Sequence, residues 1–134
     1  MDKIVIRAAV LILLVFIMMA IFYERPVDAG KRAVYLPAEG FIGNEAMGQR
    51  IFQQHCIACH GQRLEGSDAG PSLLHPYYKP DHHGDLSIYL AVYQGVTQHH
   101  WQFGNMPAQK QLTAEDAGHL LRYIRSEQRK AGLF

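Results

Sequence analysis

The pattern of apolar and polar residues divides the chain into three parts. Residues 8–23 form an uninterrupted apolar run, AAVLILLVFIMMAIFY. Extended back to Ile4, the run includes a single charge, and as a helix it would measure ~30 Å, about the thickness of a bilayer's hydrocarbon core. The pattern predicts a transmembrane anchor over residues 1–23, a proline- and glycine-containing linker over residues 24–43, and a folded domain over residues 44–134.

A cleaved signal peptide is the alternative to an anchor. Lys3 and Arg7 precede the apolar run, and residues 27–29 (VDA) offer a small-residue cleavage site. The run is longer than the ~7–15 apolar residues of an ordinary signal peptide, which favours a retained anchor. Basic residues lie on both sides of the run, so the positive-inside rule does not decide its orientation.

The first half of the domain predicts two helices. Asn44 is suited to cap a helix over residues 45–54. A second helix is predicted over residues 85–94, with Gly95 just after its end. The apolar face of this second helix is expected to hold Leu86, Tyr89, Leu90 and Tyr93.

The last part of the domain predicts a third helix and completes an all-α fold class. Thr113 followed by Asp116 resembles a capping box. Arg125 is one of the basic residues toward the helix end, where positive charge complements the helix dipole. A long loop is predicted over residues 59–74, and no β-hairpin signal is found. The predicted core positions of the third helix are Ala117, Leu120, Leu121 and Ile124.

Composition limits the classes of function. The chain has 134 residues, two cysteines and a formal net charge of +1. This length suits one small domain with an appendage. Basic and aromatic residues do not interleave as they do in nucleic-acid-binding domains, so nucleic acid is excluded as a partner.

The two cysteines lie in the motif Cys56-Ile-Ala-Cys59-His60, which is typical of covalent haem attachment. Each thiol can form a thioether with a haem vinyl group, and the adjacent histidine can supply a nitrogen to the iron. The alternatives are a zinc half-site, a thioredoxin-like dithiol or a structural disulfide. Zinc would need two more ligands, and a disulfide would leave His60 unexplained. The motif therefore favours one covalent haem c.

A second iron ligand is expected among the five methionines. Three of them are the first residue or lie in the apolar run, and Met47 lies on the helix that leads directly into the motif. Met106 remains, on a loop and followed by Pro107. A thioether ligand there would raise the reduction potential, although a methionine that fills a gap in the core is the alternative.

These motifs together resemble the class I cytochromes c in their bacterial single-haem form. The resemblance implies that the first and last helices of the domain cross, and that the carbonyl of Pro71 accepts a hydrogen bond from His60. It also implies an electron carrier, not an enzyme, outside the bacterial cytoplasmic membrane. The resemblance covers roughly residues 44–134 and rests on Gly48, Phe52, the C-x-x-C-H-G motif, Gly70, Pro71, Leu73, Gly95, Met106, Pro107, Leu120, Tyr123 and Ile124.

With the predicted anchor, such an electron carrier is expected to work with an integral-membrane redox complex, either as a tethered shuttle or as a resident subunit. The expected complexes are an oxidase, a reductase, a quinol-oxidising complex or a photosynthetic reaction centre. With the anchor in the lipid bilayer, the expected location is the bacterial inner membrane, single-pass, with the haem domain on the periplasmic side. The chain departs from the family between Gly95 and Met106, where ten residues form a longer connection. Trp101, within this connection, is expected to pack on the haem edge or cover the loop.

Eight histidines are many for this length. Those in the loops on either side of the second helix are His75, His82, His83, His99 and His100. They suit either a second metal site or solvated loops and contacts to haem propionates, since imidazole is a ligand for copper and zinc. The alternative function is accordingly a haem/copper reductase subunit that uses these loops.

Overall fold

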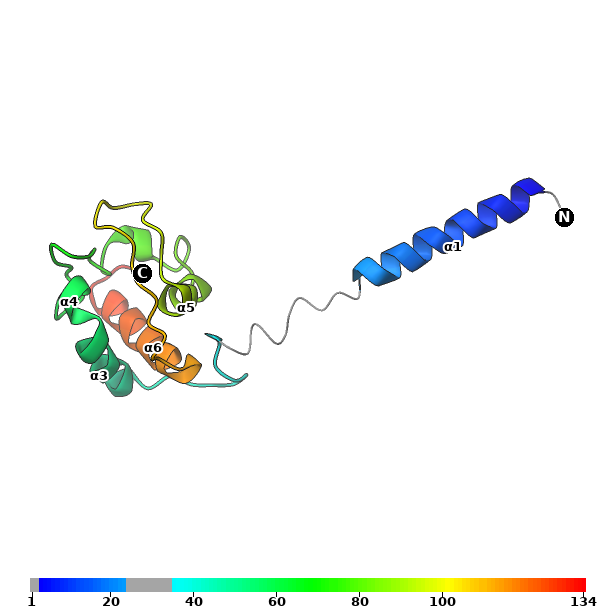
Figure 1. Cartoon of the computed structure of the whole chain (residues 1–134). Helices are drawn as coiled ribbons and strands as arrows, with labels where there is room; N and C mark the ends of the chain where they lie inside the picture. Colours follow the sequence, from blue (N-terminus) through cyan, green and yellow to red (C-terminus); the bar gives the residue numbers. More distant parts are fainter. Residues whose placement is uncertain (1–2, 24–34) are drawn as a thin grey trace. The chain divides into compact units, whose positions relative to one another are not determined.

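A computed structural model describes residues 3–23 and 35–134, which belong to two compact units, residues 1–31 and 32–134. The first unit contains helix α1 (Lys3–Tyr23; Figure 1). Among the described residues, no helix is both long and apolar enough to qualify as a membrane span. The anchor therefore stays a prediction, and residues 24–34 of the predicted linker lie outside the described residues.

In the second unit, α3 spans Glu45–His55, close to the bounds that the sequence predicted. The Asn44 side chain accepts a hydrogen bond from the backbone N–H of Met47, so it caps this helix. Cys56 ends α3 and starts the one-turn helix α4 (Ile57–His60). The loop predicted from residue 59 therefore begins only at Gly61, because the attachment motif itself is helical.

Three further elements complete the unit: the 3₁₀ turn η1 (Pro76–Tyr78), α5 (Asp85–Gln94) and α6 (Ala114–Lys130). The all-α expectation is confirmed, since the described residues outside helices form only isolated β-bridges. The predicted capping box is present, with Thr113 and Asp116 each accepting a hydrogen bond from the other's backbone N–H. All four predicted core residues of α6 are buried: Ala117, Leu120, Leu121 and Ile124.

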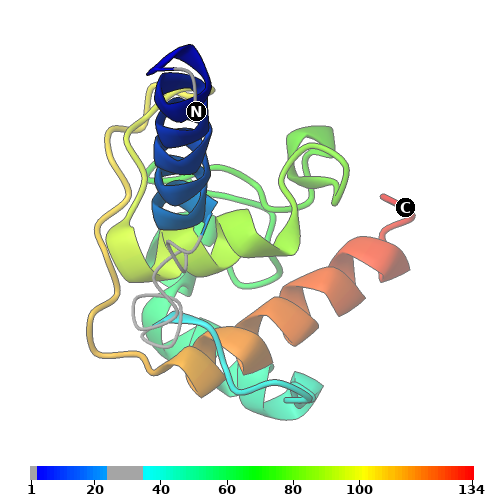
Figure 2. The same cartoon turned by 90° about the vertical axis from the view of Figure 1, so that its right-hand side faces the viewer.

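Helices α3 and α6 cross in close contact, as the resemblance implied (Figure 2). A Cβ atom at Gly48 would lie 2.0 Å from the carbonyl oxygen of His119, so only glycine allows the backbones to approach this closely. Next to this point, the rings of Phe52 and Tyr123 pack with their centroids 5.6 Å apart. The crossing holds the end of α3, and thus the cysteine motif, against α6.

The prediction of the buried face of α5 is wrong in part. Leu86 is 52% exposed and Tyr93 is 40% exposed, whereas Val92 is buried and Ile88 packs on the core. The physical reason is that α5 carries apolar residues around most of its circumference, so its periodicity does not specify one buried face. Packing against the rest of the domain selects the face.

Residues 35–43, assigned to the linker from the sequence, pack on the helical unit. The ring of Phe41 lies 5.0 Å from that of His119, and Tyr35 lies 5.3 Å from Tyr93. The His119 Nδ1 atom also accepts a hydrogen bond from the backbone N–H of Asn44. The compact unit therefore starts before the predicted domain boundary at residue 44.

Candidate haem site

The two cysteines of the motif are free and half-buried at the junction of α3 and α4. Burial, with a smaller contribution from Cys59, raises the pKa of the Cys56 thiol to about 11. A thiol with such a pKa stays protonated at neutral pH, whereas the nucleophilic cysteine of a thioredoxin-like dithiol needs a lowered pKa. The raised pKa of Cys56 argues against a disulfide exchange site.

His60 is oriented by a hydrogen bond from its Nδ1 atom to the carbonyl oxygen of Pro71, at 2.9 Å. A carbonyl oxygen only accepts, so Nδ1 carries the proton and Nε2 keeps its lone pair. Burial lowers the pKa of His60, while the contact with Pro71 opposes this shift. The ring is therefore a neutral imidazole with Nε2 available for a metal, as the resemblance implied.

The loop after the motif closes tightly around it. The Ser67 hydroxyl donates to the carbonyl oxygen of Cys59 at 2.7 Å, and the backbone N–H of Gly66 donates to that of His60 at 2.8 Å. A Cβ atom at Gly70 would lie 2.9 Å from the Cys59 side chain. These contacts help to place Pro71 beside His60.

A cavity of about 400 Å³ lies beside the motif. This volume falls within the ~300–1,000 Å³ of ordinary ligand sites. Cys56, His60, Pro71 and Met106 line it together, whereas Cys59 is not part of its wall. Much of the remaining wall is apolar and comes from α3, α5 and α6: Phe52, Ile88, Ala91, Val92, Leu120 and Ile124.

The ten-residue connection between Gly95 and Met106 forms a closed loop. Val96 and Met106 exchange two backbone hydrogen bonds, at 3.0 and 2.9 Å, across the base of this loop. Inside it, Asn105 Oδ1 accepts from the N–H of Gln98, and Gln98 Oε1 accepts from that of Gly104. The extra residues project away from the base, so Met106 lies next to the end of α5, as it would after a short connection.

A buried polar cluster holds the segment between η1 and α5, and sequence reasoning missed it. Arg125 is only 5% exposed and binds Asp85 Oδ1 at 2.8 Å. Its guanidinium also donates to the backbone carbonyls of Tyr78 and His83, at 2.7 and 2.6 Å. The sequence suggested only that this arginine complements the helix dipole, and no local signal marks it as buried.

We expect Arg125→Met to lower the free energy of unfolding by about 3 kcal/mol, because several partly buried acceptors lose their donor at ~1–3 kcal/mol each. Denaturant titration of the haem-loaded protein measures this change as a shift of the unfolding midpoint. The slope of the free energy of unfolding against denaturant concentration should stay the same. The matched control is Arg122→Met, an exposed arginine on the same helix. A loss no larger than that of the control would contradict the role of Arg125.

The residues around the cavity fit a covalently held haem. Cys56 presents an un-ionised thiol, His60 presents a free Nε2 atom, and Met106 supplies a soft sulfur on the wall of the same cavity. This donor set matches the histidine–methionine ligation of electron-transfer haem proteins. Zinc is a poorer fit, since the motif offers no further thiolate.

Comparison with known proteins agrees with this site. The sequence model of the family described as Cytochrome c matches residues 45–128. A relative, the menaquinol:cytochrome c reductase cytochrome c subunit of Bacillus subtilis (strain 168), is 48% identical over 44 residues. That match covers 32% of this chain and 17% of the relative, so the chain spans a small part of that protein's length. No solved structure matches. The match over residues 45–128, together with the motif and the cavity, shows that the chain belongs to the cytochrome c family as a class I, electron-transferring member that carries covalently bound haem c.

Proposed function

We propose that this chain is a membrane-anchored cytochrome c that exchanges electrons with an integral-membrane redox complex through a single haem. Haem c is held by Cys56 and Cys59, with His60 and Met106 as the iron ligands. When bound, haem supplies a one-electron Fe(III)/Fe(II) couple. The observation that carries this proposal is the single cavity whose wall contains Cys56, His60 and Met106, with His60 oriented by Pro71.

Each of these residues has a distinct task. The thioethers keep the haem on the chain during turnover. The hydrogen bond to Pro71 keeps the proton of His60 on Nδ1 and increases the basicity of Nε2. The apolar wall excludes water, and the sulfur of Met106 favours the reduced iron. No side chain has to donate or accept a proton for electron transfer.

The anchor is supported by the apolar sequence that forms α1 (Lys3–Tyr23). The domain would then work on the periplasmic side of a bacterial inner membrane. By its name, the Bacillus subtilis relative is a subunit of a menaquinol:cytochrome c reductase. This relative supports a quinol-oxidising complex as the partner and a resident subunit or a dedicated donor as the role.

The charge of the domain favours tethering over long-range steering. Residues 44–134 contain eight basic and eight acidic residues. Before the haem propionates are counted, the domain has no net charge, so it gains little from electrostatic attraction to its partner. A tether raises the effective concentration instead. Exposed Ala58 and half-buried Ile57, between the two cysteines, supply a small apolar surface for contact.

We expect electron transfer in native membranes to depend on the tether much more than on salt. A protease site placed at Gly30 allows the linker to be cut, and stopped-flow absorbance of the haem follows its reduction. Cutting should slow reduction at least ~10-fold, since tethered modules reach effective concentrations far above those in solution. Raising ionic strength should change the rate by less than about twofold.

The same membranes, with the protease site present but uncut, serve as the control. Mass spectrometry of the extracted protein should find the chain from Met1 onward with one haem. A mature chain that starts near Gly30 would contradict the anchor. If salt abolishes transfer while the cut has no effect, the domain is an electrostatically steered shuttle and the proposed partner mode is wrong.

A further inference from the structure

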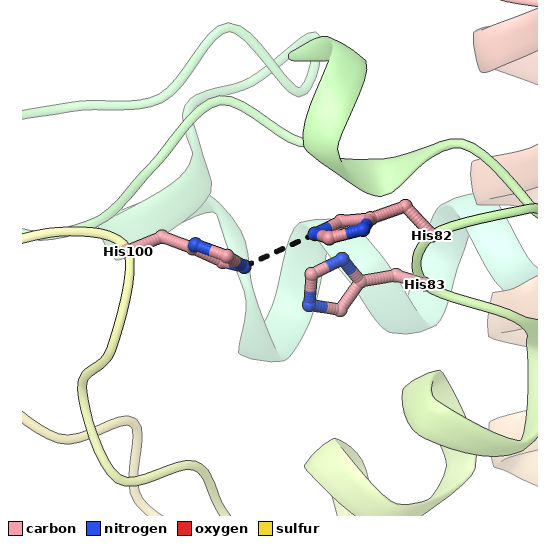
Figure 3. A group of neighbouring side chains, drawn as sticks. All are labelled: His82, His83 and His100. Atoms are coloured by element: carbon pink, nitrogen blue, oxygen red, sulfur yellow. Dashed lines mark hydrogen bonds between the residues drawn. The ribbon is translucent and has the colours of Figure 1, made fainter.

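Three histidines from two loops meet at one point (Figure 3), and two of them, His83 and His100, line the cavity. His82 and His83 lie between η1 and α5, and His100 lies in the loop closed by Val96 and Met106. One ring nitrogen from each histidine lies within 4.8 Å of the others. The sequence places these histidines in loops on either side of α5, and the fold brings members of both loops together.

The distance between two of these rings fits a shared metal ion. The Nε2 atoms of His82 and His100 are 3.4 Å apart, the contact dashed in Figure 3. A good hydrogen bond would be shorter, at ~2.7–3.2 Å. Two imidazole nitrogens on one tetrahedral zinc ion, each ~2.0–2.1 Å from the metal, lie about 3.3–3.4 Å apart. The pair therefore has the spacing of two ligands.

The third ring keeps one nitrogen free for a metal. His83 Nδ1 lies 2.5 Å from the backbone carbonyl of Tyr77, which only accepts hydrogen bonds. The proton therefore resides on Nδ1, and Nε2 keeps its lone pair. Metal-binding histidines commonly make this contact through their other nitrogen.

Hydrogen bonds and ring packing hold both loops in place. The backbone N–H groups of His82 and His83 donate to the carbonyl of Lys79, at 3.0 and 2.7 Å, and buried Arg125 binds the carbonyl of His83. On the other side, the ring of His100 packs on Tyr77 at 4.5 Å. A site whose ligands are already positioned loses little conformational entropy when it binds an ion.

The donor atoms of the cluster suit a transition-metal ion. Its three members are all imidazoles, and no carboxylate belongs to the group among the described residues. Imidazole nitrogens are common ligands of zinc and copper.

We propose that His82, His83 and His100 bind one divalent transition-metal ion of the zinc and copper class, with a fourth position left for water. The site is separate from the haem ligands, and it goes beyond the proposed electron transfer. The ion would join the segment before α5 to the loop that carries Met106, and it would thereby stabilise that loop.

Zinc binding to the full-length, haem-loaded chain tests this site. The protein, without an affinity tag, is stripped with EDTA and titrated with Zn²⁺ by calorimetry, followed by X-ray absorption at the zinc edge. We expect one zinc ion per chain with three imidazole nitrogens at ~2.0–2.1 Å. His82→Ala should weaken binding at least ~100-fold, since even outer-shell changes cost ~10–100-fold.

His55→Ala, which removes an exposed histidine of α3 outside the cluster, is the control and should leave zinc affinity unchanged. His82 is exposed and does not line the cavity, whereas His83 and His100 do. Unchanged haem absorption will show that His82→Ala remains folded. Absence of stoichiometric zinc binding, or binding that survives His82→Ala, overturns the proposal and leaves the cluster as a contact of the cavity wall.

Discussion

Replacing Cys56 and Cys59 together by serine is expected to remove covalent haem and to abolish cooperative unfolding of the domain. The cavity lies against the small core that α3, α5 and α6 share, and its wall includes core residues such as Phe52, Val92 and Leu120. A bound haem fills this volume with apolar contacts. Without it, a domain of about 100 residues keeps a poorly packed interior.

Acid–acetone extraction and thermal unfolding followed by near-ultraviolet circular dichroism measure these two effects. In the parent protein the colour should stay with the polypeptide, and in the double variant it should move to the organic phase. Ala58→Ser, at the exposed position inside the motif, is the matched control and should keep both the haem and the transition. Colour that leaves the parent protein would refute covalent attachment.

Replacing Met106 by alanine is expected to lower the haem reduction potential by on the order of 0.1–0.3 V, within the ~0.8 V range that axial ligands span. A thioether stabilises Fe(II), so its loss favours the oxidised state. The oxidised protein should also lose the weak near-infrared band of methionine–iron ligation. Redox titration and near-infrared absorption measure the two changes.

Met47→Ala is the matched control for this variant. Met47 lies on α3, is 39% exposed, has its sulfur in contact with Arg50 and does not line the cavity. The Met47→Ala variant should keep the haem reduction potential and the near-infrared band of the parent protein. If the band survives in Met106→Ala, another methionine is the sixth ligand and the assignment of Met106 is wrong.

Local signals made most helices and the central motif predictable from the sequence. Asn44 and the pair Thr113 and Asp116 cap helices by contacts within three residues, so their effect does not depend on the rest of the fold. The core face of α6 follows from a regular apolar period. The cysteine motif is equally local, because its chemistry requires two thiols and an imidazole within five positions.

The helices and the chemistry of residues that are neighbours in the chain therefore follow from the sequence alone. Contacts between distant residues decided the rest. Arg125 binds Asp85 across 40 positions, and His82 meets His100 across 18. The base of the loop before Met106 is closed by backbone hydrogen bonds that no side-chain pattern encodes. Such contacts depend on which surfaces pack together, so only the tertiary structure shows the buried face of α5, the place of Met106 and the histidine cluster.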